Sequence, residues 1–231
     1  MRILTVGLDA DDTLWHNETI FRLTHDRFCG LLTEVAETPV IEARLAEIEG
    51  RNLALYGYGV KGFTLSMIET AMELTEGQAP PRVVAEILAA GREMLAHPAE
   101  PLPGVAEALD ELSQDYRLVL ITKGDLLHQE QKLAASGLGD LFSGVEIVSE
   151  KRVDTYARIF ARHGTGPEAA VMCGNSMKSD ILPALGAGAA AAYVPYPLIW
   201  AHEVADAPEG HPRFVELGAI SELPAWVRGL G

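Results

Sequence analysis

The sequence predicts an α/β protein in which a parallel sheet carries a helical insertion. Short apolar runs alternate with helix-like segments through residues 99–231, and this alternation is typical of parallel strands joined by right-handed crossovers. Residues 17–98 show helical spacing throughout. The apolar run at 3–8 precedes that stretch, so we expect it to join the later strands. This gives a core domain of residues 1–16 and 99–231, with an all-helical domain, residues 17–98, inserted after the first strand.

Hydrophobic periodicity places the individual elements in chain order. Residues 3–8 form a run rich in β-formers that ends abruptly in acidic residues, as a buried strand does at its carboxyl end. Four blocks with apolar residues at helical spacing follow, at residues 31–35, 45–55, 67–74 and 83–88. The later strands are expected at residues 117–122, 145–148, 170–173 and 189–194. Helices are expected before and between them, including residues 105–115, residues 155–163 and a helix from about residue 178.

Composition and net charge indicate a globular protein and exclude several kinds of binding partner. The 231 residues carry a formal charge of −15 and are 48% hydrophobic, which indicates a folded globular protein and excludes a nucleic-acid binder that works through a basic face. An anionic membrane surface is excluded as a partner for the same reason. No apolar run reaches the roughly 18 residues of a membrane span, and the first segment turns acidic too early for a signal peptide, so we expect a cytoplasmic protein. So acidic a protein needs a locally cationic site to bind an anionic substrate.

Cysteine and histidine positions indicate neither a disulfide framework nor a zinc knuckle. The two cysteines, Cys29 and Cys173, lie far apart and form no CxxC pair. The histidines show no HxxxH spacing. A zinc site is therefore not expected.

Three carboxylates follow the first strand within four residues: Asp9, Asp11 and Asp12. They repel one another, and a hard divalent cation with oxygen ligands is the usual remedy at a partly buried strand end. The alternative is a helix-capping cluster on a solvated loop, because acidic turns are common.

Polar segments also follow three later strands. Thr122 and Lys123 end one apolar run, Lys151 comes after the next, and residues 174–180 (GNSMKSD) come after a third. Because the carboxyl ends of parallel strands share one edge of the sheet, we expect these side chains to converge where the strand order reverses. Three of the five lysines, including Lys178, lie in or beside these segments and would make that edge locally cationic.

Taken together, these segments resemble the haloacid dehalogenase superfamily. The sequence DADDTL, the threonine in LVLITKGD, Lys151 and GNSMKSD stand in the order of its four motifs, and the resemblance spans residues 3 to about 195. It implies a Rossmann-like core, with a helical cap inserted between the first and second motifs. It also implies Mg²⁺ as the cofactor and an aspartyl-phosphate intermediate.

The resemblance implies a role for each residue that matches a motif of the superfamily. Asp9 matches the nucleophile, and Asp11 matches the general acid/base whose backbone carbonyl binds the metal. Thr122 matches the hydroxyl that hydrogen-bonds a phosphoryl oxygen, Lys151 matches the cation that neutralises nucleophile and phosphate, and Asp180 matches the carboxylate that completes the Mg²⁺ shell.

Two positions depart from the common pattern of the superfamily. Asn175 stands where many members have aspartate, so one negative charge is missing while an oxygen ligand for the metal is kept. Lys151 is followed by Arg152 where a proline-containing segment is common, and Lys123 and Lys178 are the nearby substitutes for its cationic role.

Substrate contacts are expected from both domains. Lys123 lies beside the phosphate-binding threonine, and Tyr58 and Lys61 lie in a glycine-rich, aromatic stretch of the helical domain, where they would contact the leaving group. The alternative for that stretch is a flexible turn between helices. Trp15, directly after the first motif, either lines the entrance or packs at the junction.

The resemblance leaves several reactions open, and Asp11 discriminates among them. A halide leaving group needs no proton, whereas an alkoxide does, so Asp11 favours a phosphatase that hydrolyses a small phosphorylated metabolite. The alternatives are a phosphomutase, another phosphoryl-transfer or dehalogenase-type enzyme, and a non-catalytic Mg²⁺- or phosphate-binding scaffold, which Asn175 alone favours. The expected partner is a small phosphate ester. Residues 195–200, rich in proline and aromatics, are either a homodimer surface or a cover for the core.

Overall fold

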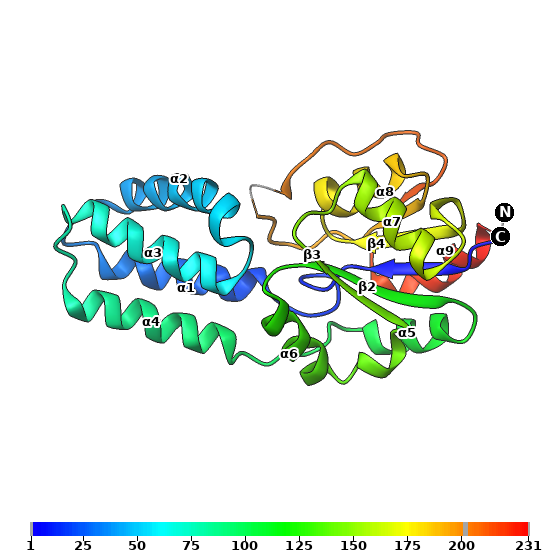
Figure 1. Cartoon of the computed structure of the whole chain (residues 1–231), viewed down its shortest axis with the longest axis horizontal. Coiled ribbons are helices and arrows are strands. Elements are labelled where there is room, and N and C mark those ends of the chain that lie inside the picture. Colours follow the sequence, from blue (N-terminus) through cyan, green and yellow to red (C-terminus); the bar gives the residue numbers. More distant parts are fainter. Residues whose placement is uncertain (1, 201–202, 231) are drawn as a thin grey trace. The chain divides into compact units, whose positions relative to one another are not determined.

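The computed structural model describes residues 2–200 and 203–230 and contains a six-stranded parallel sheet (Figure 1). The strand order is β3-β2-β1-β4-β5-β6. The strands are β1 (Thr5–Leu8), β2 (Arg117–Lys123), β3 (Gly144–Val148), β4 (Ala170–Gly174), β5 (Ala190–Tyr193) and β6 (Phe214–Glu216). The helices of this part are α5 (Val105–Ser113), α6 (Leu126–Ser136), α7 (Val153–His163), α8 (Leu182–Gly186) and α9 (Leu223–Gly229). The predicted α/β class with a Rossmann-like core is confirmed.

Alternating side chains on the central strands bury both faces of the sheet. In β1, Val6 and Leu8 pack into one core with α5 and α9, whereas Gly7 faces the second core, which includes residues of α7 and α8. A Cβ atom on Gly7 would lie 2.8 Å from Ile121 and 3.1 Å from Phe160, so a larger residue here would require these side chains to shift. Strands buried on both faces read as continuous apolar runs, which is why the sequence reveals them.

The observed elements differ from the expected ones at the carboxyl-terminal end. β6 and α9 extend the sheet and its covering layer beyond the last expected strand. β6 has only three half-exposed or exposed residues, too few for a periodic signal. The helix expected from about residue 178 is present, but it begins as a π-helical turn, Met177–Ile181, before the five-residue α8.

Four helices occupy the stretch with helical spacing: α1 (Glu18–Leu31), α2 (Thr38–Tyr56), α3 (Val60–Leu74) and α4 (Pro81–Leu95). Their apolar faces form a separate core around Phe28, Ile41, Met67 and Ile87. Chain contacts divide the protein into two compact units, one of residues 19–98 with 124–128 and one with the remainder of the described chain. We call these the helical unit and the sheet unit. None of the described helices is both long and apolar enough to cross a membrane.

Candidate active site

The candidate site lies in the sheet unit, at the carboxyl edge of the sheet where the strand order reverses. β1 stands between β2 and β4 and pairs in parallel with both. Asp9 directly follows β1, Thr122 lies in the last two residues of β2, and Asn175 directly follows β4. Lys151 follows β3, the next strand outward. The fold therefore delivers one polar side chain from each of four neighbouring strands.

Lys151 bridges two buried carboxylates. Its Nζ contacts Oδ1 of Asp9 and lies 2.6 Å from Oδ1 of Asp180. The second oxygen of Asp180 accepts a hydrogen bond from the backbone N–H of Ser176 at 2.9 Å. Asp9 and Lys151 are each 6% exposed and Asp180 is fully buried. Two carboxylates and one ammonium leave an excess of negative charge, which favours a further cation.

Burial and mutual repulsion govern the ionisation of this group. Burial raises the pKa of Asp9 to about 7, Asp180 adds to the rise, and the ammonium of Lys151 opposes it. Burial alone would lower the pKa of Lys151, but Asp180 and Asp9 raise it overall. Lys151 is therefore a cation at neutral pH, and Asp9 depends on nearby cations to stay ionised.

Asp11 occupies a different environment, in which three donors hold its carboxylate. Trp15 Nε1 donates to Oδ1 at 2.7 Å, Lys132 Nζ to the same oxygen at 2.8 Å, and Gln129 Nε2 to Oδ2 at 2.9 Å. Burial would raise the pKa of Asp11, but Lys132 and these hydrogen bonds lower it overall. Asp9 and Asp11, two residues apart, thus have pKa values shifted in opposite directions. Trp15 is fully buried and packs at the site, and it does not line an entrance.

Asp12 caps a helix and does not contribute its carboxylate to the site. Its carboxylate accepts hydrogen bonds from the backbone N–H groups of Asn17 at 2.8 Å and Glu18 at 2.9 Å, at the start of α1. Its φ of +61° lies in the left-handed region, which aspartate and asparagine tolerate better than most residues. Helix capping therefore accounts for Asp12.

Oxygen atoms gather around Asn175. With the amide oriented as its hydrogen-bond network favours, its nitrogen donates to Oδ2 of Asp9 at 3.1 Å and to the carbonyl oxygen of Asp11 at 3.2 Å. Thr13 completes this set, since its hydroxyl donates to the same Asp9 oxygen at 3.2 Å. Rotation of the amide would present a further oxygen. With the amide so rotated, the carboxylates of Asp9 and Asp180, the Asp11 carbonyl and the Asn175 amide would supply oxygen ligands only, which suit a hard divalent cation such as Mg²⁺.

Thr122 is buried beside Asp11. Gln129 links the two, because its Nε2 also lies 3.0 Å from the Thr122 hydroxyl and 2.7 Å from the Lys123 carbonyl oxygen. Oε1 of Gln129 is buried and has no hydrogen-bond partner among the described residues. The amide of Gln129 thus fixes the spacing between the carboxylate and the hydroxyl.

Lys123 is held at the edge of the site by Glu203. Its Nζ donates to Oε1 of Glu203 at 2.6 Å and to the hydroxyl of Ser179 at 2.9 Å. The other oxygen of Glu203 accepts a hydrogen bond from Ser176. Burial would raise the pKa of Glu203, but Lys123 and these hydrogen bonds lower it overall. Glu203 therefore ties β2 to the turn after β4.

Replacing Glu203 with glutamine should lower stability in a pH-dependent way. Because the folded-state pKa of Glu203 is depressed, its contribution is present above the unfolded value of about 4.3 and is lost as pH falls through the folded pKa. We expect Glu203→Gln to lose about 2 kcal/mol at pH 7 and less at pH 3. Urea unfolding at both pH values, with the exposed Glu209→Gln as control, checks this. An equal loss at both would contradict it.

The remaining predicted contacts belong to other parts of the chain. Tyr58 and Lys61 belong to the helical unit, where Lys61 Nζ lies 2.9 Å from both carboxylate oxygens of Asp125. Lys178 is exposed on the turn after β4. In the segment 195–200, Tyr196 is buried and its hydroxyl lies 2.6 Å from Nδ1 of His16, so at least this aromatic covers the core.

Three polar residues of the site were not singled out from the sequence: Gln129, Lys132 and Glu203. Gln129 and Lys132 lie three positions apart on α6 and so share one face of it. That spacing, directly after the second strand motif, was an available signal. Glu203 stands in an irregular segment, where no periodicity indicates the direction of a side chain.

Comparison with known proteins shows the family to which the chain belongs. A family model described as haloacid dehalogenase-like hydrolase matches residues 3–188. A solved haloacid dehalogenase-like family hydrolase from Xanthomonas campestris is 44% identical, with a TM-score of 0.88, over 99% of this chain and 91% of that chain. A hydrolase from Bacillus subtilis solved with magnesium is 17% identical, with a TM-score of 0.67, over 98% of this chain and 99% of that chain, and shows a shared fold alone.

Curated relatives with shorter matches are phosphatases. A glyceraldehyde 3-phosphate phosphatase from Methanothermobacter thermautotrophicus is 35% identical over 100 residues, which are 41% of this chain and 44% of that protein. An N-acylneuraminate-9-phosphatase from Rattus norvegicus is 26% identical over 134 residues, 54% of this chain and 51% of the relative. The chain thus spans about half the length of the curated relatives it matches. Since the family model covers most of the sequence and the fold and motif order agree with it, the chain belongs to the haloacid dehalogenase-like hydrolases.

Proposed function

We propose that this protein is a Mg²⁺-dependent phosphatase that hydrolyses a small phosphorylated metabolite through an aspartyl-phosphate on Asp9. The observation that carries the proposal is the contrast between two carboxylates of one loop: Asp9 lies against Lys151, whereas Asp11 is fixed by three hydrogen-bond donors. One carboxylate is suited to attack and the other to proton transfer. The phosphatases among its relatives support the same reaction class.

In the first step Asp9 attacks the phosphorus atom and the ester bond to the leaving oxygen breaks. A carboxylate oxygen of Asp9 forms the new bond to phosphorus, and Asp11 gives the departing alkoxide its proton. In the second step Asp11 takes a proton from water and the resulting hydroxide attacks the phosphorus. The bond between the phosphorus and the Asp9 oxygen breaks, inorganic phosphate departs, and Asp9 is again an ionised carboxylate. Atoms and charge balance over the two steps as ester plus water giving alcohol plus phosphate.

The environment of Asp11 suits the second step directly. Its three donors favour the ionised carboxylate, which is the form a base requires. For the first step Asp11 must carry a proton, and an approaching phosphate provides the reason: negative charge nearby raises the pKa of a carboxyl group. Substrate binding would therefore favour the protonated form of Asp11, which can act as the acid.

Cationic and hydroxyl groups would bind the phosphoryl group. Lys151 neutralises negative charge on Asp9 and on the phosphate, and the buried Thr122 hydroxyl, positioned by Gln129, would donate to a phosphoryl oxygen. Mg²⁺, when held by Asp9, Asp180, Asn175 and the Asp11 carbonyl, would neutralise further phosphoryl charge. Tyr58 and Lys61 of the helical unit remain the predicted contacts to the leaving group.

Removal of divalent metal should abolish the proposed activity. We expect hydrolysis of a generic aryl phosphate to fall to background in EDTA and to return when Mg²⁺ is added in excess, because the buried site carries uncompensated negative charge. Released phosphate measures the reaction. Halide release from 2-chloropropionate serves as the competing assay, since dehalogenases share this fold. Halide release without phosphate release would overturn the proposal, and so would metal-independent phosphatase activity.

A further inference from the structure

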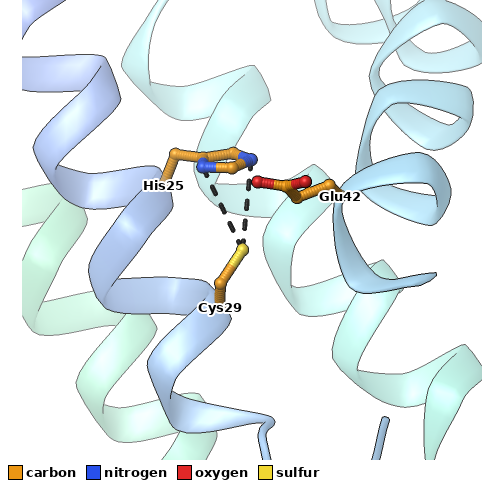
Figure 2. Close-up of side chains that lie close together, drawn as sticks. All are labelled: His25, Cys29 and Glu42. Atoms are coloured by element: carbon orange, nitrogen blue, oxygen red, sulfur yellow. Dashed lines mark hydrogen bonds between the residues drawn. The ribbon is translucent and has the colours of Figure 1, made fainter. Parts of the chain in front are cut away.

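A second group of metal-ligating side chains lies in the helical unit (Figure 2). His25 and Cys29 belong to α1, and Glu42 belongs to α2. Each offers one ligand atom, and these atoms all lie within 4.8 Å of one another. The sulfur of Cys29 lies 4.0 Å from both ring nitrogens of His25. Figure 2 shows the carboxylate of Glu42 beside the same ring.

The helix geometry explains why these groups meet. His25 and Cys29 are four residues apart, so they lie one turn apart on the same face of α1. Glu42 lies in the second turn of α2, next to Ile41, which packs in the same core as Cys29. An HxxxH pattern does not reveal this group, because the two ligands on one helix are a histidine and a cysteine.

We propose that His25, Cys29 and Glu42 bind a zinc-class divalent metal ion. A thiolate, an imidazole and a carboxylate are the three side-chain ligands that Zn²⁺ uses, and a site with three protein ligands keeps its fourth position open to water. The thiolate selects against Mg²⁺ and Ca²⁺, which prefer oxygen. The site is thus chemically distinct from the all-oxygen set at the sheet edge.

The distances need only a small adjustment. Zinc bonds of about 2.3 Å to sulfur and about 2.0 Å to nitrogen place those two atoms about 3.5 Å apart in a tetrahedral site. The observed separation of this pair is 4.0 Å, so a shift of about half an ångström brings it into range. The ligand oxygen of Glu42 lies within 4.8 Å of the other two ligand atoms, and its exposed side chain can rotate to close that gap. Oδ1 of Asp26 lies 3.4 Å from Nδ1 of His25. Asp26 can therefore accept the Nδ1 proton and leave Nε2 for the metal.

Burial and charge also suit a cation. Cys29 is 4% exposed and anchored in the helical core, whereas His25 is half-buried and Glu42 is exposed, so an ion can enter from solvent. The carboxylates of Glu42 and Asp26 both lie near His25. A metal ion bound here would displace the thiol proton of Cys29 and neutralise this excess of acidic groups. By ligating both helices it would clip α1 to α2.

Cobalt substitution tests the site through its sulfur ligand. Co²⁺ added to the full-length protein should give a sulfur-to-cobalt charge-transfer absorption that saturates at one equivalent and is reversed by Zn²⁺. Asp9→Asn should retain the band, because the carboxylate at the sheet edge contributes no thiolate. Cys29→Ser should abolish it. Absence of the band in the wild-type protein, or its persistence in Cys29→Ser, would overturn the proposal.

Variants of the two less buried ligands test their roles without changing the buried thiol. His25→Gln and Glu42→Gln should each weaken Co²⁺ binding at least about tenfold. The exposed residues His97 and Glu34 supply matched controls, and His97→Gln and Glu34→Gln should bind as the wild type does. If both ligand variants bind Co²⁺ with unchanged affinity, the proposed ligand set is wrong. The absorption is read independently of catalysis, so failure of the phosphatase proposal leaves this test intact.

Discussion

Replacing Asp9 with asparagine should lower kcat for phosphate ester hydrolysis by about 10⁴-fold or more, because the proposed covalent intermediate forms on its carboxylate oxygen. The neutral amide is a poor nucleophile. It has nearly the same shape as the carboxylate and can still accept a hydrogen bond from Lys151, so we expect the variant to fold. Steady-state phosphate release measures the loss, and circular dichroism confirms the fold.

Asp12→Asn is the matched control, three residues along the same loop. Asparagine can cap α1 through its side-chain oxygen and tolerates the left-handed backbone of this position. The control should therefore retain most of the activity. Retention of more than a few per cent of kcat in Asp9→Asn, or an equal loss in Asp12→Asn, would argue against Asp9 as the nucleophile.

A phosphate mimic separates catalysis from mere binding. Beryllium fluoride with Mg²⁺ should bind the wild-type protein at Asp9 as an analogue of the aspartyl-phosphate, and Asp9→Asn should not bind it. A scaffold that only held phosphate or Mg²⁺ would bind inorganic phosphate equally in both proteins. Titration by isothermal calorimetry distinguishes these outcomes.

The positions of Asp9, Thr122 and Asn175 at one sheet edge could be predicted because a short continuous apolar run is a local signal of a buried strand. Each residue ends or follows a run that is apolar on both faces, and parallel strands in a right-handed arrangement must bring those ends together. For the acidic residues after the first strand, the sequence left two alternatives open, a metal-binding site and a helix cap. The structure assigns capping to Asp12 alone and leaves Asp9 and Asp11 at the site.

Local sequence patterns do not predict which side chains of helices or irregular segments reach the site. Gln129 and Lys132 reach Asp11 only because α6 turns one face toward it, and this direction depends on tertiary packing. Glu203 reaches Lys123 across 80 positions of sequence, from a segment without periodicity. The group of His25, Cys29 and Glu42 likewise joins α1 and α2, and the sequence alone does not predict that these two helices pack side by side.

Replacing Lys151 with methionine should destabilise the protein by about 3–5 kcal/mol at neutral pH, in the absence of added metal. The ammonium is almost fully buried and is shared by Asp9 and Asp180. Methionine fills similar volume without charge, so the two carboxylates would face each other uncompensated. Urea unfolding followed by circular dichroism measures the loss. Lys132→Met is the matched control, with an expected loss of about 1 kcal/mol, because Asp11 keeps two other donors.

Lowering the pH should restore part of this stability, and the direction follows from linkage. The pKa of Asp9 is already raised from 3.8 to about 7 with Lys151 present, and removing the ammonium removes a contribution that lowers it. A group whose folded pKa exceeds its unfolded value stabilises the fold below the unfolded pKa and loses that contribution as pH rises through the folded pKa. Lys151→Met should therefore be more stable at pH 5 than at pH 8, relative to the wild type. A deficit independent of pH would show that Lys151 contributes packing rather than charge.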